Sequence, residues 1–97
     1  MNAPLFEQPS LPSALASESL MLDVALAGQR LVAVGERGFI LLSEDGGRSW
    51  RQVVSPVSVT LTRVVFPSAT RGWAVGHAGV VLHSQDGGLS WNKQLDG

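Results

Sequence analysis

Ser43-Glu44-Asp45-Gly46-Gly47-Arg48-Ser49-Trp50 decides the fold of this chain, because it returns 41 residues later (86 − 45 = 41) as Ser84-Gln85-Asp86-Gly87-Gly88-Leu89-Ser90-Trp91. Each copy has the composition of a tight hairpin turn. The aspartate carboxylate is expected to accept hydrogen bonds from backbone N–H groups a residue or two further on, and the paired glycines supply positive φ angles. The tryptophan is expected to begin the next strand, with its ring over the turn and an acceptor for its indole N–H.

The rest of the chain repeats with the same spacing. Outside the turns, the identical pairs are Arg30 and Arg71, Ala33 and Ala74, Val34 and Val75, Gly35 and Gly76, Gly38 and Gly79, and Leu41 and Leu82. A repeat of about 40 residues that holds four short strands is typical of a β-propeller blade. The residues expected to form the two structural turns are Ser43, Asp45, Gly46, Gly47 and Trp50, and Ser84, Asp86, Gly87, Gly88 and Trp91.

Four strands are expected in each repeat, at 20–27, 30–34, 39–42 and 50–54 in the first, and at 61–67, 72–75, 80–83 and 91–95 in the second. The middle strands are apolar runs without alternation, which predicts burial on both faces of each sheet. We therefore predict an all-β fold of the β-propeller type, with two four-stranded antiparallel blades. The domains are an extended, proline-rich N-terminal arm at 1–19, blade 1 at 20–56 and blade 2 at 57–97.

Composition excludes several classes of function. The 97 residues carry a formal net charge of −1 and form no basic stripe, so no nucleic-acid partner is predicted. No apolar run approaches the roughly 20 residues of a membrane span, and the first residues lack the pattern of a signal peptide. The chain has no cysteine, so disulfides play no part and the cysteine content says nothing about the compartment.

The eight-residue turns resemble the Asp-box of the BNR repeat, which occurs in sialidases and in many propellers that are not enzymes. In those proteins it joins the third and fourth strands of a blade. The phrases Leu31-Val32-Ala33-Val34-Gly35-Glu36-Arg37-Gly38 and Gly72-Trp73-Ala74-Val75-Gly76-His77-Ala78-Gly79 further resemble the photosystem II assembly/stability factor (Ycf48-like) family. This resemblance covers about residues 20–97.

The resemblance implies a non-catalytic module that binds proteins or helps to assemble a membrane or envelope complex. It also implies an exported compartment, such as the bacterial periplasm. Members of the family are generally complete propellers, which have about 4–8 blades, whereas two blades cannot close a ring. Any function that needs a complete ring is therefore in question for this chain alone.

An alternative is a fragment of a sialidase-like or other Asp-box glycoside hydrolase whose catalytic residues lie outside this chain. Sialidase chemistry uses a tyrosine nucleophile, and this chain has no tyrosine. His77 and His83 are the only histidines, and with no cysteine and no nearby carboxylate pair they form no metal-ligand set. We therefore predict no enzymatic activity, no catalytic residue, no metal and no cofactor.

The binding candidates are Glu36, Arg37 and His77 on turns that share one face with the 55–60 connection, and Arg63, expected to point to the channel. Ordinary solvation of surface turns is the simpler explanation for their charge. The expected partner is a protein. A second expectation is a homo-oligomer, because each end of a two-blade pair presents an apolar face that monomers rarely leave exposed, and head-to-tail contacts close into rings.

Overall fold

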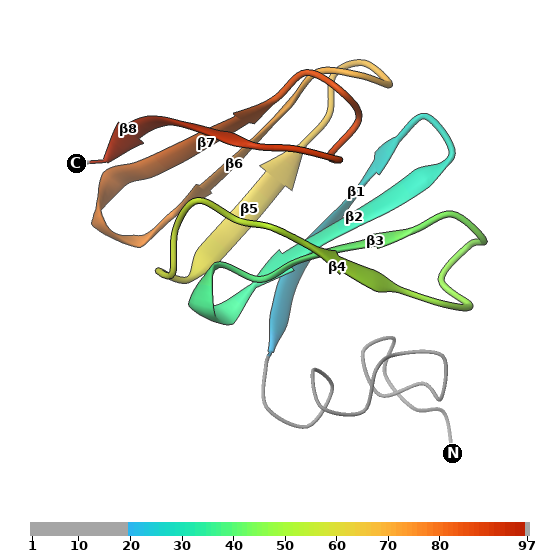
Figure 1. Cartoon of the computed structure of the whole chain (residues 1–97), viewed down its shortest axis with the longest axis horizontal. Coiled ribbons are helices and arrows are strands. Elements are labelled where there is room, and N and C mark those ends of the chain that lie inside the picture. Colours follow the sequence, from blue (N-terminus) through green and yellow to red (C-terminus); the bar gives the residue numbers. More distant parts are fainter. Residues whose placement is uncertain (1–19, 97) are drawn as a thin grey trace.

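In the computed structural model, which describes residues 20–96, the chain forms two separate four-stranded antiparallel sheets (Figure 1). The first sheet contains β1 (Met21–Ala27), β2 (Arg30–Gly35), β3 (Ile40–Ser43) and β4 (Arg51–Val53). The second contains β5 (Leu61–Val65), β6 (Gly72–Gly76), β7 (Val80–Ser84) and β8 (Asn92–Asp96). A short 3-10 turn joins the middle strands of each sheet, at Glu36–Gly38 and at His77–Gly79. The arm predicted for residues 1–19 lies outside the described residues.

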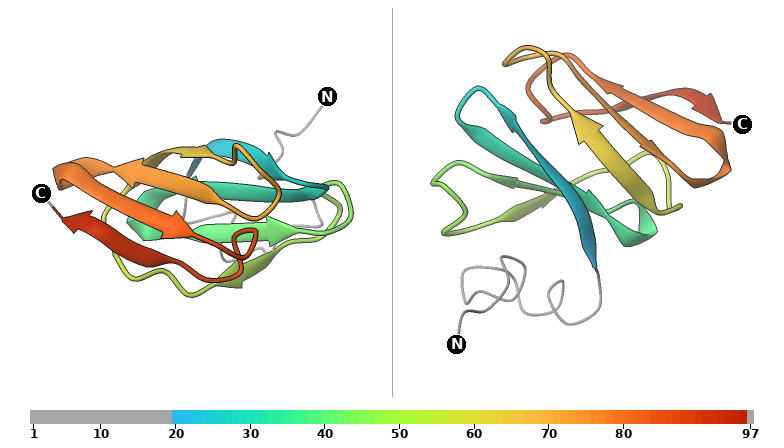
Figure 2. Two further views of the ribbon diagram at one scale, coloured as in Figure 1. Left: turned by 90° about the horizontal axis from the view of Figure 1, so that it is seen from above. Right: turned by 180° about the vertical axis from the view of Figure 1, so that it is seen from behind.

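Each sheet is an up-and-down meander, because its strands are hydrogen-bonded in the order of the sequence. β1 and β5 lie against each other, and the outer strands of the two sheets fan apart from them (Figures 1 and 2). This is the arrangement of two adjacent blades in a propeller. The prediction of an all-β chain with two four-stranded antiparallel blades is therefore confirmed.

One apolar core joins the two blades. It is filled from the first blade by Val32, Val34, Ile40 and Leu42, and from the second by Leu61, Val64, Ala74, Leu82 and Trp91. None of these side chains is more than 7% exposed. A smaller cluster on the opposite face of the first blade contains Ala33, Leu41 and Trp50, with Met21 and Leu31 packed against it.

Several expected strand limits differ from the observed ones for local reasons. Trp50 and Trp91 were expected to begin strands, but each precedes its strand, because its indole ring folds back over the Asp-box turn. β5 ends at Val65, short of the expected Pro67. Phe66 turns away to pack edge-on against Trp91, with ring centroids 5.8 Å apart, and proline has no N–H for a ladder.

The repeat distance of 41 residues does not hold for the innermost strands. Ala33 pairs with Val24, and its counterpart Ala74 pairs with Val64. The innermost strands are therefore offset by 40 residues (64 − 24 = 40), while the rest of the blade keeps 41 (74 − 33 = 41). The extra residue lies in the connection from β5 to β6, which is longer than the two-residue turn between Ala27 and Arg30.

Burial on both faces was expected for the middle strands, and this holds for only one blade. In the first blade, β3 and the last four residues of β2 are buried on both faces. In the second blade β6 and β7 alternate, with Trp73 and Val75 each 36% exposed. Their outward face has no neighbouring sheet among residues 20–96, so the same apolar pattern is left partly open.

Candidate functional site

The Asp-box turn of the first blade is held by a closed set of hydrogen bonds. The Ser43 hydroxyl donates to Asp45 Oδ1 at 2.9 Å and accepts from the Gly47 N–H at 2.8 Å. Asp45 then accepts from the Ser49 N–H at 2.9 Å and from the Ser49 hydroxyl at 2.6 Å. The Trp50 indole N–H donates to the Gly47 carbonyl at 3.1 Å. The expectation that the carboxylate would bind N–H groups one or two residues on was wrong, because the bond spans four.

The second blade repeats this geometry. Asp86 accepts from the Ser84 hydroxyl at 2.9 Å and from the N–H and hydroxyl of Ser90 at 2.9 and 2.6 Å. The Trp91 indole N–H donates to the Gly88 carbonyl at 2.9 Å. Both glycines of each pair have positive φ, with Gly46 at 75° and Gly47 at 95°, and this reverses the chain so that the following serine meets the carboxylate.

These hydrogen bonds stabilise the charged form of each aspartate. The hydroxyl and N–H of Ser49, and then the Ser43 hydroxyl, lower the pKa of Asp45 to about 2. For Asp86, burial acts to raise the pKa, but the hydrogen bonds from Ser90 and Ser84 outweigh it and the pKa is lowered. Both carboxylates are committed to their own turns, which gives them the chemistry of structural groups.

We expect acid to remove the contribution of Asp45. Its pKa is about 2 in the folded chain and about 3.9 when unfolded, so its stabilisation is present above about pH 4 and is lost as the pH falls towards 2. Asp45→Asn should melt at a lower temperature than the parent at pH 7, with the gap shrinking between pH 4 and pH 2. Thermal melts across this range check the result, and a gap that is independent of pH would contradict it.

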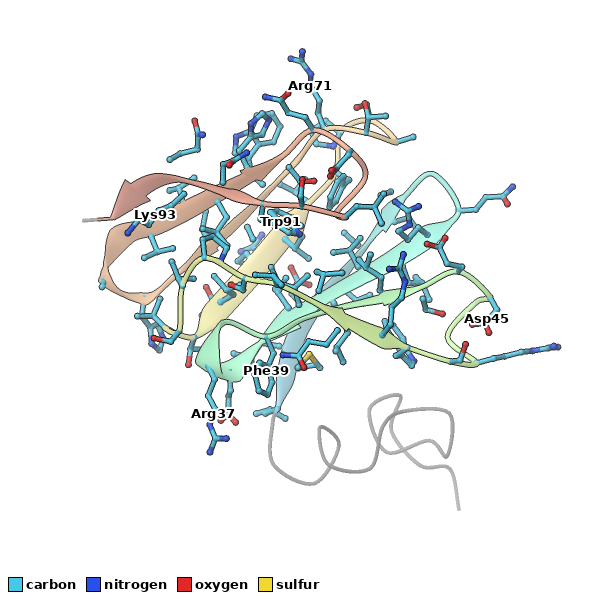
Figure 3. The ribbon with its side chains drawn as sticks, viewed as in Figure 1. Arg37, Phe39, Asp45, Arg71, Trp91 and Lys93 are labelled. Atoms are coloured by element: carbon cyan, nitrogen blue, oxygen red, sulfur yellow. The ribbon has the colours of Figure 1, made fainter. Side chains whose placement is uncertain are left out.

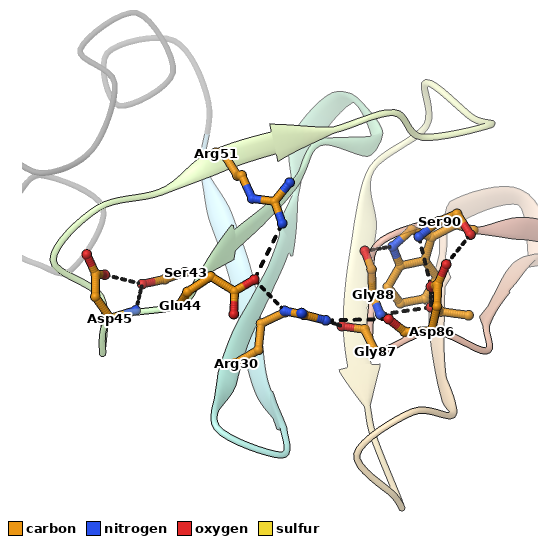
Figure 4. A network of polar contacts seen from close by, with 11 residues as sticks. Arg30, Ser43, Glu44, Asp45, Arg51, Asp86, Gly87, Gly88 and Ser90 are labelled. Carbon is orange, nitrogen blue, oxygen red and sulfur yellow. Dashed lines mark hydrogen bonds and ion pairs between the residues drawn. The ribbon is translucent and has the colours of Figure 1, made fainter.

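The two blades are linked by Arg30, a residue to which sequence reasoning assigned no role (Figure 4). Its Nε donates to Glu44 Oε2 at 2.7 Å, and its Nη1 donates to the Gly87 carbonyl at 2.9 Å and the Asp86 carbonyl at 3.4 Å. The Arg51 guanidinium also approaches Glu44 Oε2, at 3.4 Å. An arginine of blade 1 therefore binds the backbone of the Asp-box turn of blade 2. The available signal was the identity of Arg30 and Arg71.

A groove of about 450 Å³ opens at the opposite end of the blades from the Asp-box turns. It is lined by Glu36, Arg37, Ser58, Val59, Thr60 and His77. Figure 3 shows Arg37 and Asp45 at opposite ends of the first blade. The groove thus brings together three of the four predicted binding residues, from both blades and the segment that connects them. It offers a carboxylate, a guanidinium, an imidazole and two hydroxyls beside one apolar side chain.

Arg37 and Glu36 are held by the backbone around them. Arg37 has a φ of 61° and Ala78, its counterpart in the second blade, a φ of 60°, the left-handed region that L-residues rarely adopt. The Glu36 N–H donates to the Leu20 carbonyl at 2.9 Å, while Glu36 Oε1 accepts from the Leu20 N–H at 3.1 Å. Glu36 therefore anchors the start of the first blade, and the turn presents Arg37 outward.

The structure separates the remaining candidates from this groove. Arg63 pairs with Val75 across β5 and β6, so it shares the outward face of the second blade. His83 lies on that face too, stacked on Trp73 with ring centroids 4.7 Å apart, and its Nε2 is buried without a hydrogen-bond partner. Among residues 20–96, no group of three or more His, Asp or Glu side chains could hold a metal ion.

No helix within residues 20–96 has the length and apolar character needed to cross a membrane.

Comparison with known proteins identifies the family. Residues 7–96 match the family described as "Photosynthesis system II assembly factor YCF48". No curated protein matches the chain. Among solved structures, "YCF48 bound to D1 peptide" is 30% identical with a TM-score of 0.70, and the alignment covers 80% of this chain and 27% of that one.

A second solved structure, "YCF48 from Cyanidioschyzon merolae", is also 30% identical, with a TM-score of 0.71. The alignment covers 80% of this chain and 24% of that one. The chain therefore spans about a quarter of the length of these relatives. The Asp-box turns, the two blades and the match over residues 7–96 agree, and the chain belongs to the YCF48 family of photosystem II assembly factors, with the fold of a partial β-propeller.

Proposed function

We propose that this chain is a non-catalytic propeller module that binds a segment of a client protein during the assembly of a membrane or envelope complex. The observation that carries the proposal is the groove between the blades, where Glu36, Arg37 and His77 converge with the 58–60 connection. Its volume of about 450 Å³ is in the range of about 300–1,000 Å³ found for binding pockets. A relative described as bound to a D1 peptide supports a peptide as the ligand.

The chemistry of the groove suits recognition better than catalysis. Glu36 is its only carboxylate, whereas glycoside hydrolysis uses a pair that acts as acid and as base or nucleophile. Glu36 is also engaged with the Leu20 backbone. No observation favours the alternative of a glycoside hydrolase fragment. Arg37 supplies the positive charge for an acidic side chain or a terminal carboxylate of the ligand.

The test is titration calorimetry of the chain with a synthetic D1 peptide. Arg37→Ala is expected to weaken binding about tenfold or more, which corresponds to about 1.4 kcal/mol of a charge-assisted contact. The control is Arg48→Ala, which removes an exposed arginine from the Asp-box turn at the other end of the blade and should leave binding unchanged. Equal losses in the two variants, or no loss in Arg37→Ala, would count against the groove.

The proposal also includes self-association. Two blades leave two outward faces, and head-to-tail contact between copies would cover both. About two to four copies would supply the 4–8 blades of a ring. Light scattering of the 10.3 kDa chain at micromolar concentration should therefore give a mass that is a small multiple of the chain mass. A compact soluble monomer would refute self-association and leave the peptide groove untouched.

A further inference from the structure

The two outward faces of the blade pair carry apolar side chains at matched positions. The trailing face, on the second blade, consists of Arg63, Val65, Trp73, Val75, Val81 and His83. The leading face, on the first blade, consists of Met21, Val24, Ala33, Leu41 and Trp50. Val24 is 43% exposed and Val65 is 53% exposed, so each face still presents apolar surface to solvent.

The contact between blade 1 and blade 2 serves as a template for what these faces can bind. In that contact the first blade supplies Val32, Val34, Ile40 and Leu42. The residues 41 positions later are Trp73, Val75, Val81 and His83, all on the trailing face. The second blade supplies Leu61, Val64, Ala74, Leu82 and Trp91, whose counterparts are Met21, Val24, Ala33, Leu41 and Trp50. The trailing and leading faces are thus the two halves of an interface already formed once within the chain.

The polar contact of the template has its counterpart as well. Arg30 binds the carbonyls of Asp86 and Gly87 across the interface. Arg71 occupies the position of Arg30 in the second blade, is exposed, and points away from the molecule (Figure 3). At Gly87 an added Cβ would lie 2.6 Å from Arg30 Nη1, whereas at Gly46 it would meet nothing within 4 Å. The space beside Gly46 is therefore open where a neighbouring arginine would lie.

The glycines of the turn fit the same contact. An added Cβ at Gly88 would lie 3.0 Å from Val32 Cγ2 and 3.3 Å from Leu42 Cδ2, so the turn approaches the first blade closely. By the repeat, Gly47 of a second copy would lie over Trp73 and His83. One contact is not repeated, because Asp23 accepts from the Val64 N–H at 2.9 Å and Arg63 stands in its place in the second blade.

We infer that the trailing face of one copy docks on the leading face of a second copy in the register of the blade 1 and blade 2 contact, with Arg71 bound to the Asp45 and Gly46 carbonyls of its neighbour. This deepens the self-association proposed above and rests on it. The occupant is a second copy, because the internal interface already pairs these side-chain types. Arg71 acts as a positioning residue for the contact, as Arg30 does within the chain.

Cysteine cross-linking tests the register, and the chain is suited to it because it has no cysteine of its own. Residues 23 and 64 are adjacent across the template, so Arg63→Cys in one copy should lie beside Val24→Cys in the next. A short bis-maleimide should link the two variants when they are mixed and link neither variant to itself. Self-linked Arg63→Cys would overturn the inference, since it reports contact between two trailing faces.

Light scattering on the full-length parent separates the two levels of the argument. An oligomeric mass without the mixed cross-link would overturn the register while sparing self-association. A monomeric mass would refute both and assign the leading face to residues 1–19 or to another protein. Arg71→Glu should raise the dissociation constant of the oligomer about tenfold or more, whereas Lys93→Glu, an equal charge change on β8 outside both faces, should not. Equal effects would overturn the role of Arg71.

Discussion

Trp91→Ala is expected to cost about 3–5 kcal/mol of unfolding free energy, which is the usual loss for truncating a buried tryptophan. Trp91 is 6% exposed in the core between the blades, packs edge-on against Phe66 and donates its indole N–H to Gly88. A domain of ordinary stability has about 5–15 kcal/mol in total. The substitution should therefore leave the chain marginally folded or unfolded.

Trp73→Ala is the matched control. Trp73 is 36% exposed on the outward face of the second blade and stacks on His83. Its loss should lower stability only as far as copies of the chain associate, so the effect should depend on protein concentration. Urea unfolding at two protein concentrations distinguishes the variants. Similar, concentration-independent losses for both would mean that the core between the blades does not dominate the stability.

Gly38→Ala is expected to cost about 2–5 kcal/mol, the sum of a left-handed backbone penalty and steric overlap in a packed site. Gly38 has a φ of 73°, and an added Cβ would overlap the carbonyl oxygen of Val57. That carbonyl belongs to the link between the blades, where the Ser55 hydroxyl donates to it at 3.1 Å. The substitution should push the link away from the Glu36–Gly38 turn.

Gly46→Ala provides the comparison, because its φ of 75° is nearly the same and its added Cβ would meet nothing within 4 Å. It should cost only the backbone penalty of about 1–2 kcal/mol. Thermal or urea unfolding of the two variants isolates the overlap with Val57. If Gly46→Ala were as destabilising as Gly38→Ala, the contact between the turn and the link would not be the cause. Gly38→Ala should also weaken peptide binding, since the 58–60 segment lines the groove.

Short-range chemistry explains why the fold could be predicted. The turn of Asp45 is closed by Ser43 and Ser49, all within one stretch of seven residues, and the glycine pair beside it has the positive φ that such a stretch requires. Four strands per repeat follow from apolar runs bounded by such turns. Two copies of one pattern then indicate blades. The family resemblance was visible for the same reason, because its phrases lie on the middle strands.

Other features depend on residues that are far apart in sequence. Arg30 reaches Gly87 at a separation of 57 residues, and Asp23 reaches Val64 at a separation of 41. Neither pair is marked by a local pattern. The one-residue change of offset in β5 was hidden as well, because the longer connection after Val65 absorbs it without altering the repeat that follows.

The sequence by itself determined the two blades, their hairpin turns and the turns that carry Glu36, Arg37 and His77, because hydrogen bonds and apolar alternation over a few residues suffice for each. Only the tertiary structure decided that these three side chains line one groove, that Arg63 lies instead with Trp73 on an outward face, and that Arg30 joins the blades. The physical reason is that a blade buries its faces against another blade, so the packing angle and the strand register settle which side chains meet.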